Sequence, residues 1–141
     1  MSTKVVEIPA VWIAGASCSG CSVSLLNAVS PTVKNLLIDP IIPGKHLNLR
    51  FHSTVMAGQG EPAMQVLQAT RKADKGGYLV LVEGSVVGQD DGLYCTIGEV
   101  GGKQIAFQDK LLDLARDALA VVVSVGCVLK LAAVSPFTKP A

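Results

Sequence analysis

Hydrophobic and polar positions along this chain follow two periods, which predict strands in some segments and helices in others. Residues 78–82 form a continuous apolar run, and residues 5–14 and 120–125 are predominantly apolar and rich in β-branched residues, so all three segments predict buried strands. Residues 47–52 alternate between apolar and polar, which predicts a strand with one buried face. Apolar residues recur at helical spacing in four segments, residues 25–29, 31–39, 61–72 and 105–118.

The alternation of strands and helices predicts an α/β fold. We expect a doubly wound parallel sheet with right-handed crossovers and helices on both faces. The glycine-rich segment 84–102 is predicted to be irregular. With 141 residues, the chain is expected to form a single domain over residues 1–141.

Three of the four cysteines come shortly after predicted strands. Cys18 and Cys21 form a C-x-x-C pair after the first strand, and Cys127 follows the last one. Ligands of such sheets gather outside the carboxyl ends of the parallel strands. We therefore expect these three thiols to meet at one edge of the sheet.

A C-x-x-C pair alone leaves a zinc site, a redox dithiol and an iron–sulfur cluster open, beside the ordinary alternative of inert buried cysteines. A closed zinc site needs a second pair at similar spacing, which the sequence lacks. A redox dithiol leaves the third cysteine unexplained. Iron–sulfur clusters accept thiolates from distant loops, and small neighbours such as Ser19 and Gly20 leave room for the inorganic core. The sequence therefore favours an iron–sulfur cluster.

The cysteine pair belongs to a longer series of motifs. The series begins with Trp12-Ile13-Ala14-Gly15 and Cys18-Ser19-Gly20-Cys21-Ser22-Val23-Ser24-Leu25-Leu26. The segments that follow, in order, are Leu36-Leu37-Ile38-Asp39, Val55-Met56-Ala57-Gly58 with Gly60-Glu61, Tyr78-Leu79-Val80-Leu81-Val82-Glu83-Gly84, Asp91-Gly92-Leu93-Tyr94-Cys95-Thr96-Ile97-Gly98 and Gly126-Cys127. Together they resemble the N-terminal domain of nickel–iron hydrogenase small subunits, and the resemblance covers almost the whole chain up to Cys127.

The resemblance implies a flavodoxin-like fold and a proximal iron–sulfur cluster, 4Fe–4S or 3Fe–4S, bound by Cys18, Cys21 and Cys127. It places Cys95 at a position that is not a ligand in the family. It also implies a heterodimer with a large subunit, whose nickel–iron centre oxidises H2. This chain would pass the electrons to a downstream acceptor or a further iron–sulfur subunit. It is thus expected to be part of an oxidoreductase, with no catalytic centre of its own.

The chain departs from the family pattern toward its C-terminal end. The segment that supplies a fourth cysteine in the family is not found before Ala141, and the C-terminal cluster domain is expected to be absent. The actinobacterial-like type of the family ligates this cluster with three cysteines and an aspartate, so the resemblance makes Asp39 the candidate fourth ligand. The alternative is an aspartate that ends a helix before Pro40. Glu83, at the end of a buried strand, is expected to be a core carboxylate hydrogen-bonded to loop amides, in preference to a member of a proton relay.

Composition narrows the choice of partners and compartment. Charged residues make up 16% of the chain, below the roughly one quarter usual in soluble proteins, which suggests that another chain covers part of the surface. A net charge of +1 without a basic run gives no support for nucleic-acid binding. No apolar stretch approaches the roughly 18 residues of a membrane span. Without a signal-peptide pattern, the chain is predicted to be cytoplasmic, with any membrane association made through a partner.

Three other interpretations stay open. The cluster subunit of a related quinone-reducing complex shares this fold, although it has adjacent cysteines where this chain has a C-x-x-C pair. A second interpretation is that the chain is a non-catalytic fragment that cannot hold a cluster. The third is a flavodoxin-like module, which would leave the cysteines unexplained and would bind a flavin phosphate through serines after the first strand, Ser17, Ser19, Ser22 and Ser24.

Overall fold

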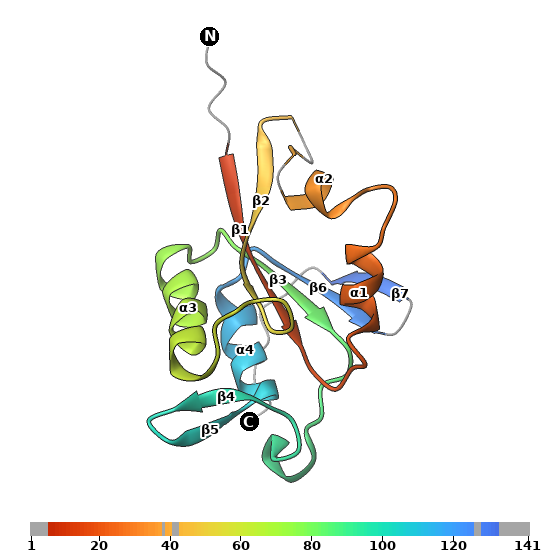
Figure 1. Ribbon diagram of the computed structural model, residues 1–141. Helices are drawn as coiled ribbons and strands as arrows, with labels where there is room; N and C mark the ends of the chain where they lie inside the picture. Colours follow the sequence, from red (N-terminus) through yellow and green to blue (C-terminus); the bar gives the residue numbers. More distant parts are fainter. Residues whose placement is uncertain (1–5, 38, 41–42, 126–127, 133–141) are drawn as a thin grey trace.

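A five-stranded sheet forms the centre of the molecule, in a computed structural model that describes residues 6–37, 39–40, 43–125 and 128–132 (Figure 1). The strands lie in the order β2-β1-β3-β6-β7. Four of them are parallel, and β7 runs antiparallel to β6 at the edge. Their bounds are β1 Val6–Ala14, β2 Lys45–His52, β3 Leu79–Glu83, β6 Ala120–Val125 and β7 Val128–Ala132. The parallel part has the strand order of flavodoxin-like sheets, which confirms the predicted fold class.

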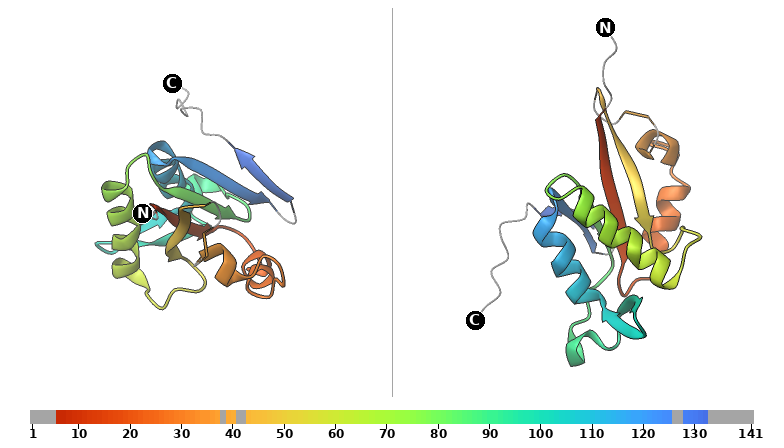
Figure 2. Two further views of the ribbon diagram at one scale, coloured as in Figure 1. Left: turned by 90° about the horizontal axis from the view of Figure 1, so that it is seen from above. Right: turned by 90° about the vertical axis from the view of Figure 1, so that its left-hand side faces the viewer.

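Helices cover both faces of this sheet (Figure 2). Helices α1 and α2 lie on one side of it, and α3 and α4 lie on the other. Their bounds are α1 Gly20–Leu26, α2 Val33–Leu37, α3 Gly60–Ala73 and α4 Phe107–Asp117. In the part of the chain that the structure describes, no helix combines the length and the apolar character that a membrane crossing needs.

The hydrophobic core lies between the sheet and the pair α3 and α4. Its most buried side chains include Val11, Ile13, Met64, Leu67, Val80, Val82, Phe107 and Leu114. The Tyr78 hydroxyl donates a hydrogen bond of 2.6 Å to the carbonyl oxygen of Leu114, and burial raises the pKa of Tyr78 to about 12. By contrast, α1 buries only Ser22, and α2 buries none of its residues. The face that carries α1 and α2 is therefore thinly covered.

Two features of the fold differ from the sequence-based prediction. The prediction of an irregular segment over residues 84–102 is wrong in part, because it contains a short 3-10 helix, η1 Gln89–Gly92, and the strand β4 Thr96–Val100. β4 pairs with β5 Lys103–Ala106, so α4 begins at Phe107, later than predicted. The edge strand β7 was not predicted either, and it adds an antiparallel strand to the expected parallel sheet.

Glycines explain the unexpected hairpin of β4 and β5. Gly101 and Gly102 form its turn with φ of +59° and +74°, a backbone region that glycine enters at little cost. Gly98 lets β4 approach α3, since an added Cβ would lie 2.6 Å from the sulfur of Met64. Gly101 and Gly102 are therefore needed for a turn and Gly98 for a close packing contact. The sequence pattern does not distinguish these uses of glycine from an irregular segment.

We predict that Gly84→Ala destabilises the fold more than an ordinary glycine substitution. Gly84 directly follows β3 with a φ of +82°, and an added Cβ would lie 2.5 Å from the Cβ of Ser17 and 2.7 Å from the carbonyl oxygen of Ala16. Alanine therefore meets both an unfavourable backbone region and a steric clash. Urea unfolding followed by circular dichroism measures the loss.

Gly101→Ala is the matched control for this prediction. Gly101 also has a positive φ, +59°, but an added Cβ would meet nothing within 4 Å. Its substitution should lower the free energy of unfolding by about 1–2 kcal/mol, the cost of the left-handed backbone alone. Equal losses in the two variants would show that the close approach beside Gly84 does not matter for stability.

Candidate functional site

The Cys18–Cys21 pair lies in the turn after β1, at the edge of the sheet where β3 and β6 also end. Ala14, at the end of β1, pairs with Glu83 of β3, and Glu83 pairs with Ser124 of β6. The carboxyl ends of these three neighbouring strands therefore lie level with one another, as expected. Cys18 is exposed, and Cys21, at the start of α1, is half-buried.

Small residues determine the path of the turn that carries the cysteines. The backbones of Ala16 and Ser85 exchange two hydrogen bonds of 3.0 and 3.1 Å, so the segments after β1 and β3 cross in direct contact. A Cβ at Gly15 would lie 2.5 Å from the carbonyl oxygen of Ser85. A Cβ at Gly20 would lie 3.1 Å from the Sγ atom of Cys18. Larger residues at these glycines would displace the crossing or crowd the thiol.

Behind this turn, the buried carboxylate of Glu83 holds α1 against the sheet. Glu83 is 1% exposed at the end of β3. It accepts hydrogen bonds from the Ser22 backbone N–H at 3.4 Å, from the Ser22 hydroxyl, and from the indole N–H of Trp12 at 3.2 Å. This confirms the expectation of a hydrogen-bonded core carboxylate, but its donors are one amide of α1 and two side chains and not the loop amides expected. Because Ser22 directly follows Cys21, the contact also positions the backbone of the second cysteine.

His52 completes the network from the end of β2. Its Nδ1 accepts a hydrogen bond from the Thr54 N–H at 3.2 Å, so the neutral ring carries its proton on Nε2. That Nε2–H donates to the Ser22 hydroxyl oxygen over 3.3 Å, and the Ser22 proton is donated to Glu83. Burial lowers the pKa of His52 from its ordinary value, although the Glu83 carboxylate opposes this shift. The His52 ring packs on Trp12, with ring centroids 4.8 Å apart.

The sequence pattern did not identify this network. Alternation along residues 47–52 places His52 on the polar face with Arg50, yet His52 is 6% exposed. The register between β1 and β2 explains the difference, since Ala10 pairs with Leu49 and Val11 pairs with Phe51. This β-bulge shifts the alternation by one residue and turns His52 inward.

The predicted third ligand, Cys127, lies outside the described residues. Val125 and Val128, which flank the segment 126–127, pair with each other where β6 ends. Among the residues that the structure describes, no three His, Cys, Asp or Glu side chains are grouped so that they could hold a metal ion. The site therefore shows two of the predicted cysteines, and the ligand role of Cys127 stays a prediction.

Asp39, the predicted fourth ligand, follows α2 and is engaged locally. Its carboxylate accepts hydrogen bonds from the Lys34 ammonium at 2.8 Å and from the Asn35 amide at 2.7 Å, and these hold the pKa of Asp39 below its ordinary value. Its backbone N–H donates to the Lys34 carbonyl oxygen at 3.1 Å, as expected of an aspartate that ends a helix. Its role as a ligand stays a prediction. Cys95, at a position that is not a ligand in the family, packs against the hydrophobic core.

The cysteine turn fits an iron–sulfur cluster in part. Thiolates are soft ligands that suit such clusters, and one turn supplies two of them. The exposure of Cys18 and the lack of a side chain at Gly20 leave its Sγ uncrowded. The remaining ligands have to come from elsewhere in the protein.

Known proteins similar to this chain form one consistent group. No protein-family model matches the sequence. Over 127 residues the chain is 36% identical to the periplasmic NiFeSe hydrogenase small subunit of Desulfomicrobium baculatum, an alignment that covers 86% of this chain and 38% of that protein. The chain spans about a third of the length of the curated relatives it matches.

Solved structures agree with this result. The chain superposes on a reduced, active form of the Ni-Fe-Se hydrogenase from Desulfomicrobium baculatum with a TM-score of 0.74 and 37% identity, over 84% of this chain and 42% of that one. It shares its fold with the actinobacterial-type NiFe-hydrogenase from Ralstonia eutropha H16, with a TM-score of 0.69 and 24% identity over 83% of this chain and 35% of that one.

We predict that Ser22→Ala loosens α1 from the sheet. The substitution removes the hydroxyl that donates to Glu83 and leaves a buried carboxylate short of one partner. The free energy of unfolding should fall by about 1–3 kcal/mol. Thermal unfolding followed by circular dichroism measures this change.

Ser24→Ala, on an exposed position of the same helix, is the matched control. It should change the free energy of unfolding by less than about 0.5 kcal/mol. If the two variants lost equal stability, the contact with Glu83 would not be what holds α1.

Proposed function

This chain belongs to the family of hydrogenase small subunits, and we propose that it is the electron-transfer subunit of a nickel–iron hydrogenase. In this proposal, the nickel–iron centre of a large subunit would supply the oxidation of H2 to two protons and two electrons. A proximal iron–sulfur cluster held by this chain would carry the electrons away. The proposal depends above all on the Cys18–Cys21 pair, which lies at the edge where β1, β3 and β6 end together.

We assign Cys18, Cys21 and Cys127 as thiolate ligands of that cluster, 4Fe–4S or 3Fe–4S. The strand register supports this ligand set, because β6 ends level with the two strands beside the cysteine turn. Cys127 follows the end of β6 in sequence after a single residue, Gly126. When bound, the cluster would supply reversible one-electron transfer.

The chain's own contribution is to hold the ligand turn in place. Ser22 ties the residue after Cys21 to the buried carboxylate of Glu83, and His52 in turn bonds to Ser22. A ligand turn that is ordered in advance loses less conformational entropy when its thiolates bind a cluster. The same contacts limit the movement of Cys21 relative to the sheet. A fixed position keeps the distance over which an electron must pass constant.

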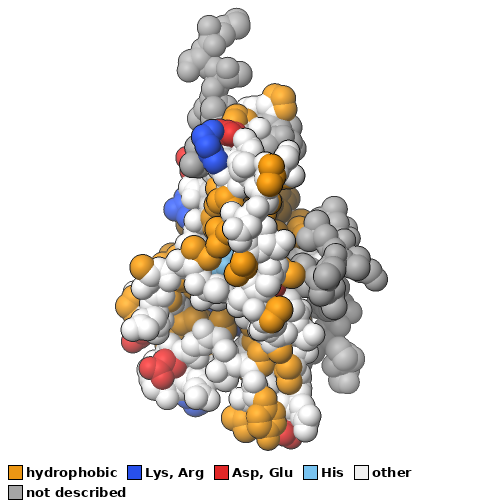
Figure 3. Space-filling model, turned by 45° about the vertical axis from the view of Figure 1, so that its right-hand side comes forward, with side chains coloured by type: hydrophobic (Ala, Val, Ile, Leu, Met, Phe, Trp, Pro, Cys, Tyr) orange, Lys and Arg blue, Asp and Glu red, His pale blue; other side chains and the backbone are white. Residues whose placement is uncertain are grey.

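We place the contact with the large subunit on the face that carries α1. Large apolar side chains there are at least half exposed, namely Val23, Leu26, Val29 and Val55. Figure 3, which brings this side of the molecule forward, shows apolar side chains spread over the face with few charged ones among them. Interfaces between permanent partners are apolar at their centre. The 16% share of charged residues agrees with such a covered surface.

The compartment and the final electron acceptor also belong to the proposal. The sequence predicts a cytoplasmic location, whereas the Desulfomicrobium baculatum relative is named a periplasmic protein. Cell fractionation followed by immunoblotting distinguishes the two. For the acceptor, we propose a downstream electron carrier or a further iron–sulfur subunit.

We predict that Cys18→Ser removes most of the bound iron and the broad visible absorption of the cluster. A serine hydroxyl is a harder and weaker ligand for iron than a thiolate. The measurement is iron and sulfide analysis of the chain, purified together with any nickel-containing subunit that accompanies it. Cys95→Ser is the control, since Cys95 packs against the core and should leave the iron content unchanged. Unchanged iron in Cys18→Ser would show the ligand assignment to be wrong.

We predict that Asp39→Ala converts the cluster to a three-iron form. A carboxylate oxygen can hold one iron where a fourth thiolate is missing, and its loss releases that iron. Ligation requires Asp39 to leave its present partners, Lys34 and Asn35. Electron paramagnetic resonance of the oxidised complex should show a three-iron signal that the parent lacks.

Asp74→Ala is the matched control for Asp39, because Asp74 lies at the end of α3 as Asp39 lies at the end of α2. Its spectrum should equal that of the parent. If the Asp39→Ala spectrum also equals that of the parent, Asp39 only ends a helix and the fourth ligand comes from elsewhere.

A further inference from the structure

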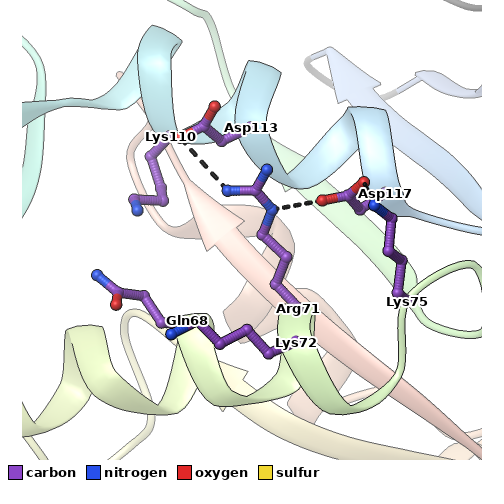
Figure 4. Close-up of a pocket in the computed structure, with 7 residues that line it drawn as sticks. All are labelled: Gln68, Arg71, Lys72, Lys75, Lys110, Asp113 and Asp117. Carbon is purple, nitrogen blue, oxygen red and sulfur yellow. Dashed lines mark hydrogen bonds and ion pairs between the residues drawn. The ribbon is translucent and has the colours of Figure 1, made fainter.

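A second site is suggested by a groove between α3 and α4, on the side of the sheet opposite to α1 (Figure 4). The groove has a volume of about 530 Å³, which lies in the range of small-molecule pockets. Four basic side chains line it, Arg71, Lys72, Lys75 and Lys110, together with Gln68 and two aspartates. None of these residues takes part in the proposed electron transfer.

The two aspartates of the groove are already neutralised by neighbouring cations. Arg71 donates from Nε to Asp117 at 2.7 Å, and its Nη1 lies 3.6 Å from Asp113. Lys75 lies 3.2 Å from Asp117. These contacts lower the pKa of Asp117 and raise the pKa of Arg71 from their ordinary values. Because both aspartates are already engaged by Arg71 and Lys75, Lys72 and Lys110 have no counter-ion among the residues that line the groove.

Lys110 is the best evidence that the groove has a ligand. The residue is 9% exposed, and no hydrogen bond or ion pair reaches its ammonium within the described part of the chain. Figure 4 shows its side chain extending from α4 into the groove toward Gln68 of α3, while Lys72 runs along α3 to the same region. The Lys110 stem is buried while its Nζ atom reaches the solvent of the groove, since no buried side-chain nitrogen or oxygen of the described residues lacks a hydrogen-bond partner. An ammonium group that opens on the groove without a counter-ion favours an anion there.

We propose that the groove binds a small oxyanion with two or more negative charges, of the class of phosphate and pyrophosphate. Lys110 and Lys72 supply the charge, and the Gln68 amide supplies a neutral donor. Arg71 adds a further donor, since its contacts with the aspartates use Nε and Nη1 and leave Nη2 free. An oxyanion of this class matches several convergent N–H donors better than a single spherical halide does.

Isothermal titration calorimetry with sodium phosphate and sodium pyrophosphate tests this proposal. The chain is used as it purifies, with any accompanying subunit, and sodium chloride keeps the ionic strength constant. We expect saturable binding of at least one of the two anions. Lys110→Met keeps the aliphatic stem and removes the charge, and it should weaken binding by about tenfold or more. Lys72→Met should act in the same direction.

Lys103→Met, on the exposed part of β5, is the matched control and should bind like the parent. No saturable heat with either anion would overturn the proposal. Equal affinities in the parent and in a folded Lys110→Met or Lys72→Met variant would overturn it as well. The iron content is expected to stay unchanged in both variants, so a failure here is distinguishable from a failure of the proposed electron-transfer function.

Discussion

The buried carboxylate of Glu83 is the constraint on which the candidate site depends. A carboxylate taken out of water is costly unless hydrogen bonds replace its hydration. Its donors come from Trp12 of β1 and Ser22 of α1, and His52 of β2 bonds to Ser22 in turn. Four elements therefore have to be in place at once, so the strand order and the path of the cysteine turn are determined together.

Much of the fold could be predicted from the sequence, because parallel strands that are covered on both faces consist almost entirely of apolar residues. Val80 and Val121, from two such strands, both lie in the core. The hairpin of β4 and β5 could not be predicted in the same way. Glycine serves turns, close packing and irregular chain alike, and only the position of Met64 over Gly98 shows which use applies. That contact joins residues far apart in sequence.

Only the part of the candidate site that lies directly at the ends of strands could be predicted from the sequence. Topology alone brings the turn with Cys18 and Cys21 to the edge of the sheet. The inward position of His52 depends on a β-bulge, which leaves no mark in the alternation of apolar and polar residues. Ser22 owes its role to Glu83, 61 positions away in the chain. Local pattern carries no information on such a pair.

The two faces of the sheet differ in what stabilises them. Helices α3 and α4 bury large apolar side chains, whereas α1 has seven residues, buries only Ser22 and has no side-chain cap at its N-terminus. A helix this short is not stable by itself in water. Its order must come from the Glu83 contact, from whatever binds its cysteines, and from whatever covers Val23 and Leu26 on its outer side. Because all three act on one short helix, each lowers the entropy that the others have to overcome. If the chain binds a cluster and a partner subunit as proposed, the two binding events would thus be coupled through α1.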